Sequence, residues 1–112
     1  MTYSIKISLA RRLLYLRQGD TIVRTYPVGV GKIATSTPVG KYHIISKVSN
    51  PGGPFGAMWL GLSQLHYGIH GTNNPSSIGG AVSKGCIRMY NRDVLELSRM
   101  VAVGTPVSIE GN

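Results

Sequence analysis

The stretch from Tyr3 to Leu9, YSIKISL, alternates apolar and polar side chains from one end to the other. Successive side chains of a β-strand point to opposite faces of the sheet, so this period of two predicts a strand with one buried face. Residues 13–17 predict a second strand, and residues 21–30, which are rich in β-branched and aromatic residues, predict a third. The turn signal Gln18-Gly19-Asp20 separates these two segments. The first 30 residues therefore predict an antiparallel meander.

Strand patterns return later in the chain, with one interruption and one helix. Further strands are expected over residues 41–48, 66–70 and 105–110, and residues 58–60 form a short apolar run. The polar segment 71–84 is expected to be a loop. A helix is expected to begin at Asn91, which can act as its N-cap, and to end before Gly104. Its apolar stripe is formed by Val94, Leu97 and Val101. The pattern predicts a mainly β fold with one short helix near the C-terminus.

The 112 residues fit one domain, residues 1–112. Twelve Lys and Arg against four Asp and Glu give a net charge of +8, which attracts polyanions such as nucleic acid, an anionic membrane or an anionic cell wall. The cations form no run, so we expect a solvated basic surface and no nucleic-acid site. No stretch has the length of a transmembrane helix, and residues 1–9 do not resemble a signal peptide, so the export route stays open.

Two patterns could hold a cofactor, and their surroundings argue against both. Gly29–Ala34 matches G-x-G-x-x-A, but residues 35–40 cannot form the helix that a pyrophosphate site requires, since they are β-branched and contain Pro38. His66, His70 and Cys86 could be zinc ligands, yet two residues four apart in a strand lie about 13 Å from each other. We expect no nucleotide, metal or other cofactor.

Cys86 is the single cysteine of the chain, and its neighbours suggest a reactive thiol. Lys84 and Arg88 flank it, so an extended segment would place all three side chains on one face, where the cations would lower the thiol pKa. Gly85 allows a tight turn, which could bring backbone N–H groups toward the sulfur as an oxyanion hole requires. These features favour a nucleophile over a buried core cysteine.

A cysteine nucleophile needs a base, which is normally histidine. His43 lies within a predicted strand and is expected to be partly exposed, whereas His70 ends a predicted strand and opens the polar loop. Gly71 has no side chain, so its carbonyl is open to close approach. A backbone carbonyl that accepts from the imidazole would fix its tautomer. His70 is therefore the predicted base.

These residues carry a resemblance to a known family. Ile69-His70-Gly71-Thr72 and the segment Ser83–Met89, SKGCIRM, resemble the active-site signature of the YkuD-type L,D-transpeptidase catalytic domain. Residues 37–42 and 50–56 are similar to its Thr-Pro-x-Gly turn and its glycine-rich loop. The resemblance covers nearly the whole chain. It implies a β-sandwich of mixed sheets with one short helix near the C-terminus.

The resemblance also implies an enzyme that forms peptidoglycan cross-links. In that family the cysteine attacks the L-centre residue that precedes a terminal D-residue, and an amine of a neighbouring stem peptide then attacks the thioester. Cys86 would be the nucleophile, His70 the acid/base and Gly71 the carbonyl that orients it. The N–H groups of Gly85 and Cys86 would stabilise the oxyanion. The residues that would shape the site or bind substrate are Ser83, Arg88 and Tyr67.

Several expectations remain open at this point. The family often has His at position 84 and Asn at position 88, so the roles of Lys84 and Arg88 are undecided, although Arg88 could bind a carboxylate bidentately. An L,D-carboxypeptidase that uses water as acceptor, or a non-catalytic domain that binds the wall or another polyanion, are alternatives. The resemblance implies stem peptides as partners, carbapenem-type β-lactams as inhibitors and an extracytoplasmic location at a bacterial cell wall. We expect a monomer without a separate wall-binding module.

Overall fold

The computed structural model describes residues 2–32, 37–64, 66–83 and 85–112. Part of the Gly29–Ala34 motif and the flanking cation Lys84 therefore lie outside the described residues. The strands are β1 (Tyr3–Ser8), β2 (Leu13–Gln18), β3 (Thr21–Gly31), β4 (Gly40–Ser49), β5 (Met58–Leu62), β6 (Gly68–His70), β7 (Ala81–Ser83), β8 (Ile87–Met89) and β9 (Pro106–Glu110). The helices are the 3-10 turns η2 (Gly53–Phe55) and η3 (Pro75–Ser77) and the α-helix α1 (Asn91–Met100).

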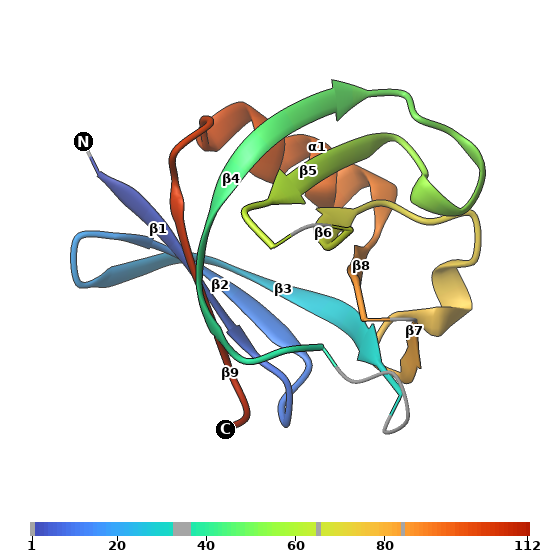
Figure 1. The fold of residues 1–112 in the computed structure, drawn as a ribbon, viewed down its shortest axis with the longest axis horizontal. Coiled ribbons are helices and arrows are strands. Elements are labelled where there is room, and N and C mark those ends of the chain that lie inside the picture. The colour runs from blue at the N-terminus through green and yellow to red at the C-terminus, as the bar shows by residue number, and fades with distance from the viewer. Residues whose placement is uncertain (1, 33–36, 65, 84) are drawn as a thin grey trace.

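The strands follow one another around a closed ring (Figure 1). Hydrogen-bonded neighbours run in the order β2-β1-β9-β4-β5-β6-β8-β3, and β3 pairs again with β2, while β7 is added beside the end of β3. The pairs β1–β9, β6–β8 and β3–β7 are parallel, so the sheet is mixed. The prediction of a mainly β domain with one short helix is confirmed. The pairing is continuous, however, so the strands form a closed, barrel-like arrangement in which the two sheets of the predicted sandwich are not clearly separate.

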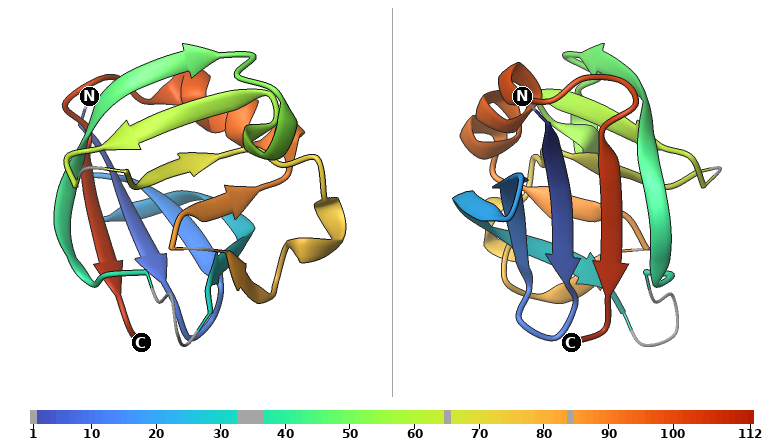
Figure 2. Two further views of the ribbon diagram at one scale, coloured as in Figure 1. Left: turned by 45° about the vertical axis from the view of Figure 1, so that its right-hand side comes forward. Right: turned by 90° about the vertical axis from the view of Figure 1, so that its left-hand side faces the viewer.

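Two long strands allow the ring to close, because each changes partners along its length. β4 pairs with β9 over residues 40–43 and with β5 over residues 44–49, with a register shift of the kind that bends a strand. β3 pairs with β2 over residues 21–27 and with β8 at residues 28–29. We call β2, β1 and β9 the β1 side of the ring, and β5, β6 and β8 the β6 side (Figure 2).

The core fills the interior of the ring and extends under α1. Alternate residues of the β1 side point inward, among them Ile7, Leu14 and Leu16, which are fully buried. α1 packs against β5 and β6 and buries Val94 and Leu97, two residues of the predicted stripe. Within the part of the chain that the structure describes, no helix has the length and apolar character needed to cross a membrane.

The helix begins differently from the prediction. Tyr90 is the N-cap, and no side chain caps the helix. Asn91 is the first helical residue, and its side chain instead binds the backbone of Ala57 and Thr72. At the other end, Lys47 Nζ donates to the carbonyls of Ser98 and Val101, which helps to satisfy the last turn.

The segment between β6 and α1 is more regular than expected. The predicted loop 71–84 contains η3 and β7, and β8 follows it. The predicted strand 66–70 is shorter, since β6 begins only at Gly68. His66 adopts a left-handed backbone conformation with φ of 69°, which a regular strand does not allow.

Candidate active site

His70 ends β6 and is held in one tautomer by the next residue. It is only 4% exposed, and its Nδ1 lies 2.5 Å from the carbonyl oxygen of Gly71. A carbonyl oxygen can only accept, so this contact assigns the proton to Nδ1 and leaves Nε2 as an acceptor. The contact between His70 and Gly71 is thus present, and its catalytic role stays a prediction.

Two aromatic residues that the sequence did not single out surround the imidazole. Trp59, the cross-strand neighbour of His70, stacks on it with ring centroids 5.5 Å apart, and Phe55 meets it edge-on at 5.2 Å. Gly68 makes room for the indole, because a Cβ at this position would lie 2.6 Å from the Trp59 ring. The signal available in the sequence was the short apolar run 58–60, which pairs with β6.

The environment favours the neutral form of His70. Burial lowers the pKa of His70 below its ordinary value; the hydrogen bond to Gly71 opposes this effect, and the positive charge of Arg88 adds to it. A neutral imidazole with a free Nε2 is the form that can accept a proton.

Cys86 is half-buried, and burial controls its ionisation. Burial raises the pKa of the Cys86 thiol above its ordinary value, and neither the backbone of Gly68 nor the charge of Arg88 fully offsets it. The thiol donates to the carbonyl of His66, with Sγ and O 3.6 Å apart. Arg88 lowers the pKa of the thiol as expected, but desolvation of the thiolate is the larger effect, so the net shift is upward. The expectation for Lys84 concerns a residue outside the described part of the chain.

The turn that carries Cys86 is held by the side chain of Ser83. Its Oγ donates to the Cys86 carbonyl at 2.6 Å and accepts from the Gly85 N–H at 3.1 Å. Gly85 has φ of 118°, a conformation that favours glycine. The Gly85 N–H, which the resemblance implied as an oxyanion donor, is thus engaged by Ser83, and Ser83 shapes the turn.

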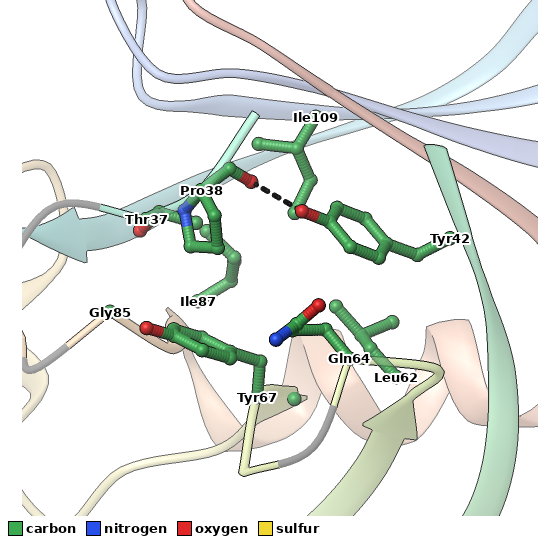
Figure 3. A pocket seen from close by; sticks show the side chains of 10 residues that line it. Thr37, Pro38, Tyr42, Leu62, Gln64, Tyr67, Gly85, Ile87 and Ile109 are labelled. Atoms are coloured by element: carbon green, nitrogen blue, oxygen red, sulfur yellow. Dashed lines mark hydrogen bonds between the residues drawn. The ribbon is translucent and has the colours of Figure 1, made fainter. Parts of the chain in front are cut away.

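Tyr67 supports the same turn from another side. A Cβ on Gly85 would lie 2.5 Å from the Tyr67 ring, so the ring packs directly on the glycine. Figure 3 shows Tyr67 beside Gly85 in a narrow apolar slot, facing Pro38 and Tyr42. Tyr67 does not line the Cys86 cleft itself, and its role in the acyl pocket stays a prediction.

Cys86, His70 and Arg88 line one cleft of about 350 Å³. The other residues around it are Lys32, Pro54, Phe55 and Ser83. No described residue of this lining is acidic, and the four acidic side chains of the chain form ion pairs with cations outside the cleft. The cleft is therefore positively charged and suits a substrate that carries a carboxylate. Nowhere in the described ranges do three His, Cys, Asp or Glu side chains gather as metal ligands would.

Comparisons with known proteins point to one family. The family model of the L,D-transpeptidase catalytic domain, YkuD, matches residues 2–109. A Bacillus licheniformis protein that carries the name L,D-transpeptidase YkuD is 64% identical over 107 residues, which cover 96% of this chain and 65% of that protein. The chain thus spans less than two thirds of the length of this relative.

Solved structures share the fold at low sequence identity. An L,D-transpeptidase from Mycobacterium smegmatis superposes with a TM-score of 0.86 at 18% identity, covering 97% of this chain and 58% of the other. L,D-transpeptidase 3 from Mycobacterium tuberculosis, in complex with a faropenem-derived adduct, gives a TM-score of 0.81 at 18% identity, with coverages of 97% and 60%.

Proposed function

Because this chain belongs to the YkuD family of L,D-transpeptidase catalytic domains, we propose that it forms peptidoglycan cross-links by acyl transfer through Cys86. One observation carries the proposal. Cys86 shares a positively charged cleft with His70, whose Nδ1 is tied to the Gly71 carbonyl. A nucleophile, an oriented base and a charged binding surface are the parts that acyl transfer requires.

The first half-reaction begins with both groups neutral. Nε2 of His70 takes the thiol proton as Sγ of Cys86 attacks the carbonyl carbon of the L-centre residue, so that a C–S bond forms and the carbonyl oxygen becomes an oxyanion. When this intermediate collapses, the amide C–N bond breaks, and His70 gives its proton to the departing amine of the D-residue. The product is a thioester on Cys86.

The second half-reaction reverses these roles. The amine of a neighbouring stem peptide attacks the thioester carbonyl and loses a proton to His70. The C–S bond then breaks, and the Cys86 sulfur regains its proton from His70. A neutral histidine at the start of each half-reaction is required for this cycle, and burial provides it.

The surrounding residues supply charge and shape. We assign the free carboxylate of the terminal D-residue to Arg88, which lines the cleft and can bind it through two parallel hydrogen bonds. Since Ser83 holds the Gly85 N–H, we assign the oxyanion to the Cys86 N–H. Stem peptides as substrates place the activity at the cell wall, outside the cytoplasm.

The test is the intact mass of the protein after incubation with imipenem, followed by product analysis with purified muropeptides. We expect one adduct in the wild type, none in Cys86→Ala, and cross-linked dimers from muropeptides. His70→Gln should lose turnover, whereas His43→Gln, which changes an exposed histidine on β4, should retain it. An adduct that persists in Cys86→Ala would refute the role of the thiol. Trimmed monomers without dimers would identify a carboxypeptidase.

A further inference from the structure

The side chain of Asn91 forms hydrogen bonds to two loops, the one after β6 and the one after η2. Its Oδ1 accepts from the N–H of Thr72 at 3.1 Å and from the N–H of Ala57 at 3.0 Å, and its Nδ2 donates to the carbonyl of Thr72 at 3.1 Å. Two glycines leave space for this amide, since a Cβ on Gly56 or Gly71 would lie 2.2 or 2.1 Å from Oδ1.

One of these hydrogen bonds controls the direction of the Gly71 carbonyl, which accepts from Nδ1 of His70. The Thr72 N–H and the Gly71 carbonyl belong to the same peptide group, which is planar, and the described residues contain no cis peptide bond. In a trans peptide the N–H and the C=O point in opposite directions. When Asn91 holds the Thr72 N–H, the Gly71 carbonyl is directed to the other side, where it meets Nδ1 of His70.

The geometry points to Asn91 as a positioning residue for the base: it holds the Gly71–Thr72 peptide so that the His70 proton stays on Nδ1 and Nε2 faces the reaction. Asn91 does not line the Cys86 cleft, so it acts through Gly71 and not on the substrate. The use of Nε2 rests on the proposed function, whereas the tautomer is a property of the free protein.

The same amide also steadies a second contact of the imidazole. Ala57 follows the loop that carries Phe55, and the Phe55 ring meets His70 edge-on. Asn91 thus links two of the elements that surround His70, the segment after β6 and the loop after η2. No helix N-cap role competes for the amide, because the cap position belongs to Tyr90.

Two substitutions distinguish the acceptor role of the Asn91 side chain from its donor role. Asn91→Asp keeps an oxygen for both N–H groups and loses only the donor to Thr72, whereas Asn91→Leu loses both functions at similar size. We expect Asn91→Leu to lower kcat with muropeptide by about 100-fold, the scale of a misplaced catalytic group, with KM little changed. Asn91→Asp should recover most of this loss. The matched control is Lys47→Met, which removes hydrogen bonds at the opposite end of α1 and should leave kcat unchanged.

The decisive readout is the nitrogen NMR spectrum of the His70 ring, which needs no substrate. The wild type should show the proton on Nδ1, and Asn91→Leu should show a mixture with Nε2–H. The direction in which the titration midpoint of His70 shifts gives a second test. The bond to Gly71 raises the pKa of His70 and burial lowers it, so loss of the bond moves the midpoint down. Mere loosening of the fold exposes the ring and moves the midpoint up.

Several results would overturn the inference. These are a wild-type ring with the proton on Nε2, an Asn91→Leu protein that keeps both tautomer and kcat, or a midpoint that rises. If Asn91→Leu does not fold, hydrogen exchange of the wild type tests the inference. The Thr72 amide should exchange slowly, and rapid exchange would show that Asn91 does not hold the Thr72 N–H. A wild type that makes no dimers but shows the tautomer response would refute the proposed function and leave the role of Asn91 standing.

Discussion

The β1 side and the β6 side of the ring are held together by different means. β1 and β2 pair over six consecutive residues each without a register shift, and every second residue enters the core. β6 and β8 have three residues each. Around them, side chains of Ser83 and Asn91 bind backbone groups of residues that lie outside the strands. The scaffold thus depends on apolar burial, and the site depends on a few polar side chains.

The largest effect on stability should come from the β1 side. Leu16→Ala removes a fully buried side chain, and we expect a loss of about 3 kcal/mol of unfolding free energy from lost transfer energy and the remaining cavity. Urea unfolding measures it. The rate of acylation by imipenem, corrected for the folded fraction, should not change, and a lower corrected rate would contradict the separation of the two sides.

Gly85→Ala should affect both stability and chemistry. Its φ of 118° disfavours a Cβ, which would also lie 2.5 Å from the Tyr67 ring. We expect a loss of about 2 kcal/mol from the backbone strain and, because the Cys86 turn must shift, acylation slower by about 100-fold. Gly19→Ala is the control on the β1 side: its φ of 60° is also positive, but no atom lies within 4 Å of the added Cβ. It should lose stability only.

The stability of the β6 side should depend on pH through His70. Burial lowers the pKa of His70 in the folded protein, so below its ordinary value of about 6.5 the unfolded chain binds more protons than the folded one. The contribution of neutral His70 to the free energy of unfolding is therefore complete above about pH 6.5 and decreases as the pH falls. Melting temperatures between pH 7.5 and 5 should fall less steeply in His70→Gln than in the wild type. Equal slopes would show that His70 does not titrate differently in the two states.

The smallest effect should come from the surface of the β1 side. Lys6 Nζ lies 3.7 Å from Glu110 Oε1, with the two side chains 40% and 44% exposed. Lys6→Gln should change the unfolding free energy by less than about 0.5 kcal/mol. Urea unfolding at low and high salt checks this, because any difference should vanish at high salt. A loss as large as that of Leu16→Ala would show that charge pairing supports the scaffold.

The β1 side could be predicted almost to the residue because its strands each have one buried and one exposed face. The apolar stripe of α1 was predictable for the same reason. The segment from β7 to β8 was not, since three-residue strands show no period and form only against β3 and β6. The closed ring also could not be foreseen, because it depends on where β3 and β4 change partners.

The order of residues was enough to predict the β character of the chain, the position of its helix and the family signature around His70 and Cys86. The chemical environment of these residues, by contrast, follows from the folded structure. Folding buries the Cys86 thiol, so that desolvation outweighs the neighbouring charge, and it brings Trp59, Phe55 and Asn91 around His70. Periodicity and charge can be read from neighbouring residues, whereas burial and hydrogen-bond partners depend on contacts between segments that are distant in the sequence.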